Sequence, residues 1–244
     1  MMQKRLLGLI SGVSLGFGLI STAVANTQLA VPKSLIALDS EQGKQIFMQT
    51  NPKHLADYWL LSSYFTTEKG LAYCAPASIV MVLNALDKTP DVAPEHSPYK
   101  IYNQSNLFYN QTILKKGITP ARINGHGMTL DQAAFVLKQY AGDVETHYGS
   151  DIKNIDAFRN ILLKAIEHKR QYVLINFART GIDEVGGGHF SPLAAYNQKT
   201  DRWLMLDVAR YKYPSVWIET KALYQAIQGV DSSSHKSRGV IIVS

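Results

Sequence analysis

The sequence predicts an α+β fold, with helices in the first part of the chain and an antiparallel sheet in the second. Apolar residues recur at helical spacing from Cys74 to Leu86, whereas short β-branched and aromatic runs separated by turns follow Gln171. The only cysteine opens that helix, and His189 and Asp207 belong to strands of the second part. We therefore expect a helical lobe, an antiparallel sheet lobe, and an active site in the groove between them.

The first helix follows an irregular approach through residues 31–70. Pro76 fits its first turn, where the missing N–H removes no hydrogen bond. A loop rich in Pro, Asn and Tyr is expected from about residue 87 to 110.

Two further helices are indicated by their N-caps, before the pattern changes to strands. Thr129 and Gln132 form a capping-box pattern for a helix to about Ala141. Asn154 can cap another through Lys169. The predicted strands and last helix are, in order, QYVLINFA, HFSPLAAY, RWLMLDV, SVWIE, a short helix over about 221–228, and GVIIV.

Cys74 is the candidate nucleophile. Its thiolate is the reactive form, which both the positive end of a helix and a neighbouring base favour. The alternative is a small buried hydrophobic residue, the role of most free cysteines. Because suitable partners occur later in the chain, the sequence favours the nucleophile.

His189 and Asp207 are the candidate base and its orienting group. Three glycines, Gly186 to Gly188, permit close backbone approach or positive φ just before His189. An antiparallel hairpin would bring Asp207 beside the imidazole, as the third member of a triad. The alternative is a structural histidine and an unrelated aspartate at a strand end.

Four segments, YCAPASIVMVLNAL, GMTLDQ, GGGHFSPLAAY and LMLDVARYKYPSVWI, resemble the catalytic domain of phytochelatin synthases. The resemblance implies a papain-like cysteine peptidase fold with Cys74, His189 and Asp207 as its triad. It also implies transfer of the γ-glutamylcysteinyl part of glutathione. The cysteine-rich region of the plant and yeast enzymes is absent, as in the short bacterial form, for which hydrolysis to γ-glutamylcysteine and glycine with weak phytochelatin synthesis is expected.

The resemblance also implies substrate-binding residues. Asp231 and Arg238 would hold the amine and carboxylate of the γ-glutamyl group, and Arg179 and Lys212 would act on the second, acceptor substrate. For Arg179 the alternative is a solvated strand end. Tyr73 could line the cleft, although an aromatic residue beside a helix is more often part of the core.

Two positions depart from the family pattern. Glu68 stands six residues before the nucleophile, where a glutamine amide is expected to help form the oxyanion hole. Losing one such donor raises the barrier by about 3–4 kcal/mol, unless a protonated Glu68 donates instead, which would favour activity at acidic pH. Ala75 stands where glycine is expected, and its methyl group could narrow the cleft.

These departures support a competing hypothesis, a catalytically weakened protein that binds glutathione, thiol peptides or their metal complexes. A third hypothesis is a cysteine peptidase for another small peptide.

The N-terminal segment predicts export, because residues 1–25 combine basic residues, an apolar run and the small-residue exit STAVA of a secretory signal peptide. The competing interpretation is a membrane anchor, but the apolar run is short and rich in Gly and Ser. We expect residues 26–244 to form a single catalytic domain in the periplasm, without a stable membrane anchor after cleavage.

The formal net charge of +6 bears on which classes of partner the protein could bind. Lys and Arg are scattered without an aromatic-basic motif, so the charge indicates solvated faces and no nucleic-acid partner. Glutathione and related γ-glutamyl thiol peptides are the expected ligands, and a homodimer is compatible with the sequence.

No metal-ligand spacing accompanies the seven histidines. We therefore expect no structural metal and no cofactor. By the resemblance, cadmium or zinc would activate the enzyme through a substrate whose thiolate carries the metal.

Overall fold

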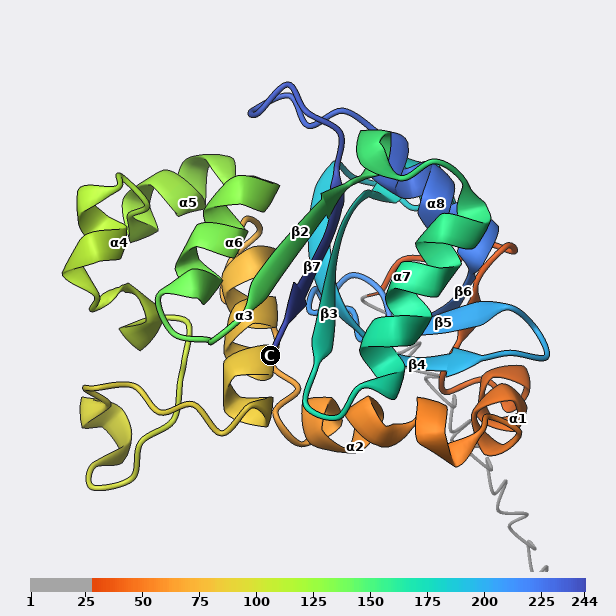
Figure 1. The fold of residues 1–244 in the computed structure, drawn as a ribbon, viewed down its shortest axis with the longest axis horizontal. Helices are drawn as coiled ribbons and strands as arrows, with labels where there is room; N and C mark the ends of the chain where they lie inside the picture. Colours follow the sequence, from red (N-terminus) through yellow and green to blue (C-terminus); the bar gives the residue numbers. More distant parts are fainter. Residues whose placement is uncertain (1–27) are drawn as a thin grey trace, which may run out of the picture.

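The computed structural model describes residues 28–244, so the predicted signal peptide at residues 1–25 lies outside the described residues. An antiparallel seven-stranded sheet forms the centre, in the order β1-β6-β5-β4-β3-β7-β2 (Figure 1). The strands are β1 Ile36–Ala37, β2 Val144–Tyr148, β3 Tyr172–Ala178, β4 Gly188–Asn197, β5 Arg202–Met205, β6 Val216–Glu219 and β7 Gly239–Val243. The helices are α1 Glu41–Met48, α2 Ala56–Ser63, α3 Cys74–Ala85, α4 Gln111–Lys115, α5 Pro120–His126, α6 Leu130–Lys138, α7 Ile155–Glu167 and α8 Thr220–Gln228.

The predicted α+β class is confirmed, and most predicted elements are found within a few residues of their expected bounds. Helix α3 begins at Cys74, the capping box of Thr129 and Gln132 is present at α6, and Asn154 caps α7. The prediction of an irregular segment at residues 31–70 was wrong, because α1 and α2 form there. Helices α4 and α5 and strand β2 were also not predicted.

Helices cover both faces of the sheet, because alternate side chains of its central strands point to opposite sides. On β3, Tyr172 and Leu174 join one hydrophobic cluster with α3 and α6, whereas Val173 and Ile175 join a second cluster with α7 and α8. Figure 1 shows α3 and α7 on opposite sides of β3. The sheet therefore lies as a layer between α3 and α6 on one face and α7 and α8 on the other.

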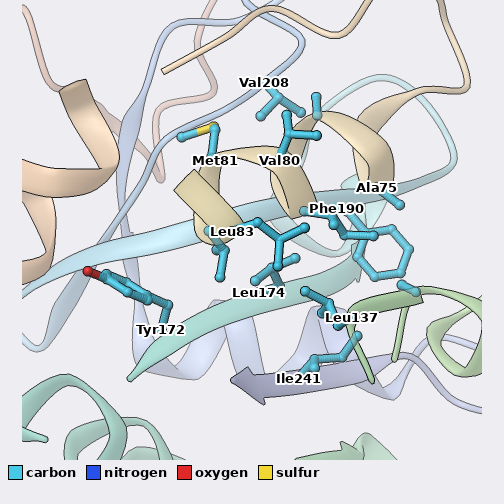
Figure 2. Close-up of a cluster of buried hydrophobic side chains, with 14 of the residues drawn as sticks. Ala75, Val80, Met81, Leu83, Leu137, Tyr172, Leu174, Phe190, Val208 and Ile241 are labelled. Carbon is cyan, nitrogen blue, oxygen red and sulfur yellow. The ribbon is translucent and has the colours of Figure 1, made fainter. Parts of the chain in front are cut away.

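Helix α3 lies at the centre of the first cluster, and every one of its residues is buried. Figure 2 shows Leu83 of this helix on the side of Leu174 of β3, and Val80 on the other side of the helix beside Val208. Burial on all sides fixes the helix against the sheet. Its first residue, Cys74, is consequently held at a defined place relative to the strands.

The register of three adjacent strands brings the other candidate residues to the same end of the sheet. His189 near the start of β4 pairs with Phe177 near the end of β3, and Leu193 of β4 pairs with Met205 of β5. Asp207 follows β5 directly, so the antiparallel hairpin returns it to the level of His189. None of the helices in residues 28–244 has the length and apolar character needed to cross a membrane.

Asp57 of α2 gives a prediction about stability. Its carboxyl group is buried, with one oxygen lacking a hydrogen-bond partner, and burial raises its pKa from 3.8 to about 8. Between these two values the unfolded chain releases a proton that the folded chain keeps, so stability falls as pH rises. Asp57→Asn should remove this loss and raise the Tm by several degrees near pH 8, since about 1 kcal/mol shifts the Tm of a chain of this size by about 2–4 °C.

The measurement is thermal unfolding of both proteins over a pH series. The Tm difference should be smallest near pH 4 and grow with pH. A difference that stays constant across the series would contradict the assignment of a protonated, buried Asp57.

Candidate active site

Cys74, His189 and Asp207 lie together, as the sequence predicted. His189 Nε2 is 2.8 Å from Asp207 Oδ1, which leaves Nδ1 as the ring nitrogen for the cysteine. A ring nitrogen of His189 and the Cys74 sulfur lie within 4.8 Å of each other. Cys74 is at the N-terminus of α3, where backbone N–H groups lack intrahelical partners and the helix dipole is positive. This order of sulfur, imidazole and carboxylate is the arrangement that activates a thiol for nucleophilic attack.

The electrostatics favour a charged histidine beside a charged aspartate. Burial alone would lower the pKa of His189, but the Asp207 carboxylate and the Cys74 sulfur raise it above its ordinary value. Burial would likewise raise the pKa of Asp207, but His189 and Arg179 hold it well below its usual range. The imidazolium form can therefore persist at neutral pH next to the sulfur.

Arg179 holds Asp207 from the other side. Its Nη1 lies 2.9 Å from Asp207 Oδ2 and its Nη2 donates to Asp207 Oδ1 at 3.1 Å. The same guanidinium pairs with Glu184, and it lies over the ring of Tyr213. Arg179 is only 3% exposed. The sequence analysis gave Arg179 a role toward the acceptor substrate, with a solvated strand end as the alternative. The side chain instead lies in the interior, where it pairs with the buried carboxylates of Asp207 and Glu184.

A cavity of about 210 Å³ opens beside the nucleophile. Cys74, Asn176, Asp231 and Arg238 line it, together with Leu71, Ala72, His126, Gly127, Met128, Gly188, Phe190, Ser232 and Ser233. The structure thus brings Asp231 and Arg238 to the same cavity as Cys74.

Arg238 faces that cavity with hydrogen-bonding capacity to spare. It is 9% exposed, its Nη1 donates to Asn176 Oδ1 at 3.4 Å, and its Nε has no partner in the structure. Burial lowers its pKa, whereas Asp231 opposes that effect. A side chain at Gly188 would place its Cβ 2.1 Å from Arg238 Nη1, so the last of the three glycines is needed for close approach.

Glu68 lies beside the nucleophile and the base. One of its carboxylate oxygens lies within 4.8 Å of both the Cys74 sulfur and a His189 ring nitrogen. Tyr211 donates a hydrogen bond to Glu68 Oε1 at 2.6 Å, and Oε2 is buried without a hydrogen-bond partner. Tyr211 also lines a larger cavity of about 590 Å³ with Phe65 and Arg210, among others.

Three other predicted residues lie outside the Cys74 cavity. Tyr73 is buried in the first hydrophobic cluster and donates to the Pro120 carbonyl, so the core interpretation describes its position. Ala75 is fully buried in the same cluster and does not line the cavity, contrary to the expectation that its methyl group narrows it (Figure 2). Lys212 is half-buried near Gly186, whose φ of 131° favours glycine.

Sequence reasoning missed Glu184, Asn176 and Tyr211. Asn176 had a signal, since it is a polar residue inside an apolar strand, and its amide nitrogen donates to the His189 carbonyl at 3.1 Å. Tyr211 had none, because its partner Glu68 lies 143 residues away. Glu184 had none either, because its pairing with Arg179, five residues away, follows no regular helix or strand spacing.

The antiparallel sheet is packed on a central helix, and a thiol at the N-terminus of that helix faces a histidine on β4 and an aspartate just after β5. This arrangement defines the papain-like class of proteins. The family model for phytochelatin synthase matches residues 26–240. The chain therefore belongs to the phytochelatin synthase family.

Curated relatives agree with this family. The chain is 32% identical over 206 residues to glutathione gamma-glutamylcysteinyltransferase 1 of Lotus japonicus, covering 84% of this chain and 39% of the relative. It is 30% identical over 213 residues to glutathione gamma-glutamylcysteinyltransferase 1 of Arabidopsis thaliana, covering 86% of this chain and 41% of the relative. It is 26% identical over 214 residues to the glutathione gamma-glutamylcysteinyltransferase of Schizosaccharomyces pombe, covering 87% of this chain and 50% of the relative. The chain thus spans about two-fifths to half of the length of these relatives.

Arg179→Met tests whether this arginine is a buried structural ion rather than an exposed substrate ligand. The change leaves the carboxylates of Asp207 and Glu184 buried without their cation, which should reduce the free energy of unfolding by about 3–5 kcal/mol. The measurement is urea unfolding.

Lys212→Met is the matched control, since it removes a neighbouring, half-buried cation that has no ion pair among the described residues. It should change the unfolding free energy by less than about 1 kcal/mol. Equal losses in the two variants would contradict the role given to Arg179.

Proposed function

We propose that this chain is a thiol acyltransferase and peptidase that acts on glutathione through a γ-glutamylcysteinyl thioester on Cys74. The single observation that carries the proposal is the cavity that Cys74 shares with a buried carboxyl group, Asp231, and a buried guanidinium group, Arg238. The names of the relatives, glutathione gamma-glutamylcysteinyltransferases, support the same substrate.

The donor's charged groups fit this cavity. A γ-glutamyl group carries an ammonium and a carboxylate on one carbon, which Asp231 and Arg238 can pair with respectively. An arginine with an unpartnered Nε suits a carboxylate, because its fork of donors is incompletely used by the protein. This recognition would place the cysteine–glycine amide near the sulfur.

Cys74, His189 and Asp207 can carry out every proton transfer that the reaction needs. The Cys74 thiolate attacks the amide carbonyl, and the His189 imidazolium gives its proton to the departing glycine amine. His189 then takes a proton from water or from the amine of a second glutathione, which attacks the thioester and restores the thiolate. Asp207 holds the ring through Nε2 during both steps.

Hydrolysis with glycine release is the main outcome in this proposal, and phytochelatin synthesis is the side reaction. No resident cofactor is needed for either step. Cadmium or zinc would act in synthesis by binding the thiolate of the substrate.

Export to the periplasm completes the proposal. Its support is the composition of residues 1–25, with a basic start, an apolar run and small residues before residue 26. Determining the N-terminal residue of protein recovered from the periplasmic fraction tests it; a start near residue 26 is the expected result, and an intact Met1 would contradict it.

The competing function is a binding protein for glutathione, thiol peptides or their metal complexes. Glu68 favours it, since an ionised carboxylate next to the sulfur would repel a developing oxyanion. The two functions share a ligand and differ in turnover.

Cys74→Ser tests the nucleophile. Glycine release from glutathione should fall at least about a thousandfold, and the mass of the wild-type chain should show a γ-glutamylcysteinyl adduct that the variant lacks. Asp207→Asn should give a large but incomplete loss, because it disturbs only the orientation and charge of His189.

Equal glycine release by wild type and Cys74→Ser would refute the nucleophile. Glutathione binding without glycine release or adduct in the wild type would instead favour the binding protein.

Glu68→Gln separates the two functions. If Glu68 weakens the oxyanion hole, the amide should raise the rate of glycine release by about a hundredfold or more. The measurement is kcat at neutral pH for both proteins. A loss of rate would mean that Glu68 has a catalytic task of its own, and Tyr211→Phe would then reduce the rate as well, because it removes the hydrogen bond that orients Glu68.

A further inference from the structure

Three possible metal ligands converge beside the cavity. One oxygen of Glu68, the sulfur of Cys74 and a ring nitrogen of His189 all lie within 4.8 Å of one another, and all three residues are buried. Zinc–ligand distances of about 2.0–2.3 Å put neighbouring ligand atoms about 3–4 Å apart. A modest rotation of the Glu68 side chain would therefore close the set around one cation.

Outer partners already orient two of the three ligands. Asp207 takes His189 Nε2, which leaves Nδ1 for a cation, and Tyr211 takes Glu68 Oε1, which leaves Oε2. A carboxylate on the far nitrogen of a metal-binding histidine is a recurring feature of zinc sites.

Glu68 Oε2 is the independent sign that something belongs there. The residue is only 5% exposed, and this oxygen has no hydrogen-bond partner among residues 28–244. A buried carboxylate oxygen without a partner is unfavourable, and a cation would satisfy it.

We propose that Glu68, Cys74 and His189 form an inhibitory binding site for a borderline-soft divalent cation, zinc or cadmium. Thiolate, imidazole and carboxylate together are a zinc ligand set, and three protein ligands leave a fourth position open. Because Cys74 lines the cavity, water or a ligand thiolate can take that position. Binding displaces the proton shared by the sulfur and the imidazole, and it occupies both reacting atoms.

The site is distinct in effect from a metal carried on the substrate. A cation on the substrate thiolate would promote synthesis, whereas a cation on Cys74 and His189 blocks attack. This inference does not depend on glutathione being the substrate, since it concerns the free protein. Glu68 and Cys74 lie six residues apart but His189 lies more than a hundred residues further on, so no local ligand spacing pointed to the set.

The experiment measures zinc binding directly and then its effect on the thiol. Isothermal titration of the full chain with zinc chloride should give one site, and cobalt in place of zinc should give a thiolate-to-metal charge-transfer band. Glu68→Gln should weaken zinc binding about 100-fold while changing few other contacts. Because the chain has one cysteine, zinc should also slow alkylation of wild-type Cys74 by iodoacetamide, and Glu68→Gln should largely lose this protection.

Asp57→Asn is the matched control, a second buried acid outside the cluster, and it should bind zinc as the wild type does. Cys74→Ser should abolish the charge-transfer band, which keeps the test decisive if Glu68→Gln fails to fold. Equal zinc affinity in wild type and Glu68→Gln would overturn the three-ligand site and leave a simple cysteine–histidine pair. Binding unchanged in Cys74→Ser would place the cation elsewhere and overturn the proposal entirely.

Discussion

The ion pairing of Arg179, Asp207 and His189 is the interaction on which the site depends. Three side chains that would each be unfavourable alone in the interior are held together there, at distances of 2.8–3.1 Å. Since the Arg179 cation and the His189 ring both face Asp207, its carboxylate stays ionised at full burial. An ionised Asp207 in turn keeps His189 charged and turned toward the sulfur. The register of the sheet makes this contact possible, because Arg179 follows β3, His189 lies on β4 and Asp207 follows β5.

Glu68 sets the balance between the chemistries that such a site can support. One of its oxygens lies within 4.8 Å of the Cys74 sulfur and a His189 ring nitrogen, beside the place that an oxyanion or a cation would take, and these two would make opposite demands on it. A carboxylate disfavours a developing negative charge and favours a metal, whereas an amide does the reverse. Under the two proposals, the same residue would slow acyl transfer and would hold a free zinc ion.

Local signals predicted the parts of the structure that local physics determines. Two N-caps could be predicted, Thr129 and Asn154, because a capping side chain bonds to the first turn of its own helix. The apolar helix that begins at Cys74 could also be predicted, because its pattern lies within one short segment. Helix α2 was missed because no side chain caps it. The burial of Arg179 could not be read from the sequence, because its partner Asp207 lies 28 residues away and only the register of the strands brings them together. The Glu68 cluster was missed as a ligand set because His189 joins Glu68 and Cys74 only through the fold.

The protonation of His189 in the free protein tests the central claim most directly. Nitrogen-15 NMR of labelled histidine, with His189 assigned by comparison with a His189→Gln variant, would follow its two ring nitrogens as pH changes. The account predicts that both nitrogens of His189 stay protonated at neutral pH and that the ring titrates above the ordinary histidine value, because Asp207 and Cys74 raise its pKa. A ring that is neutral at pH 7 and titrates at or below the ordinary value would contradict it.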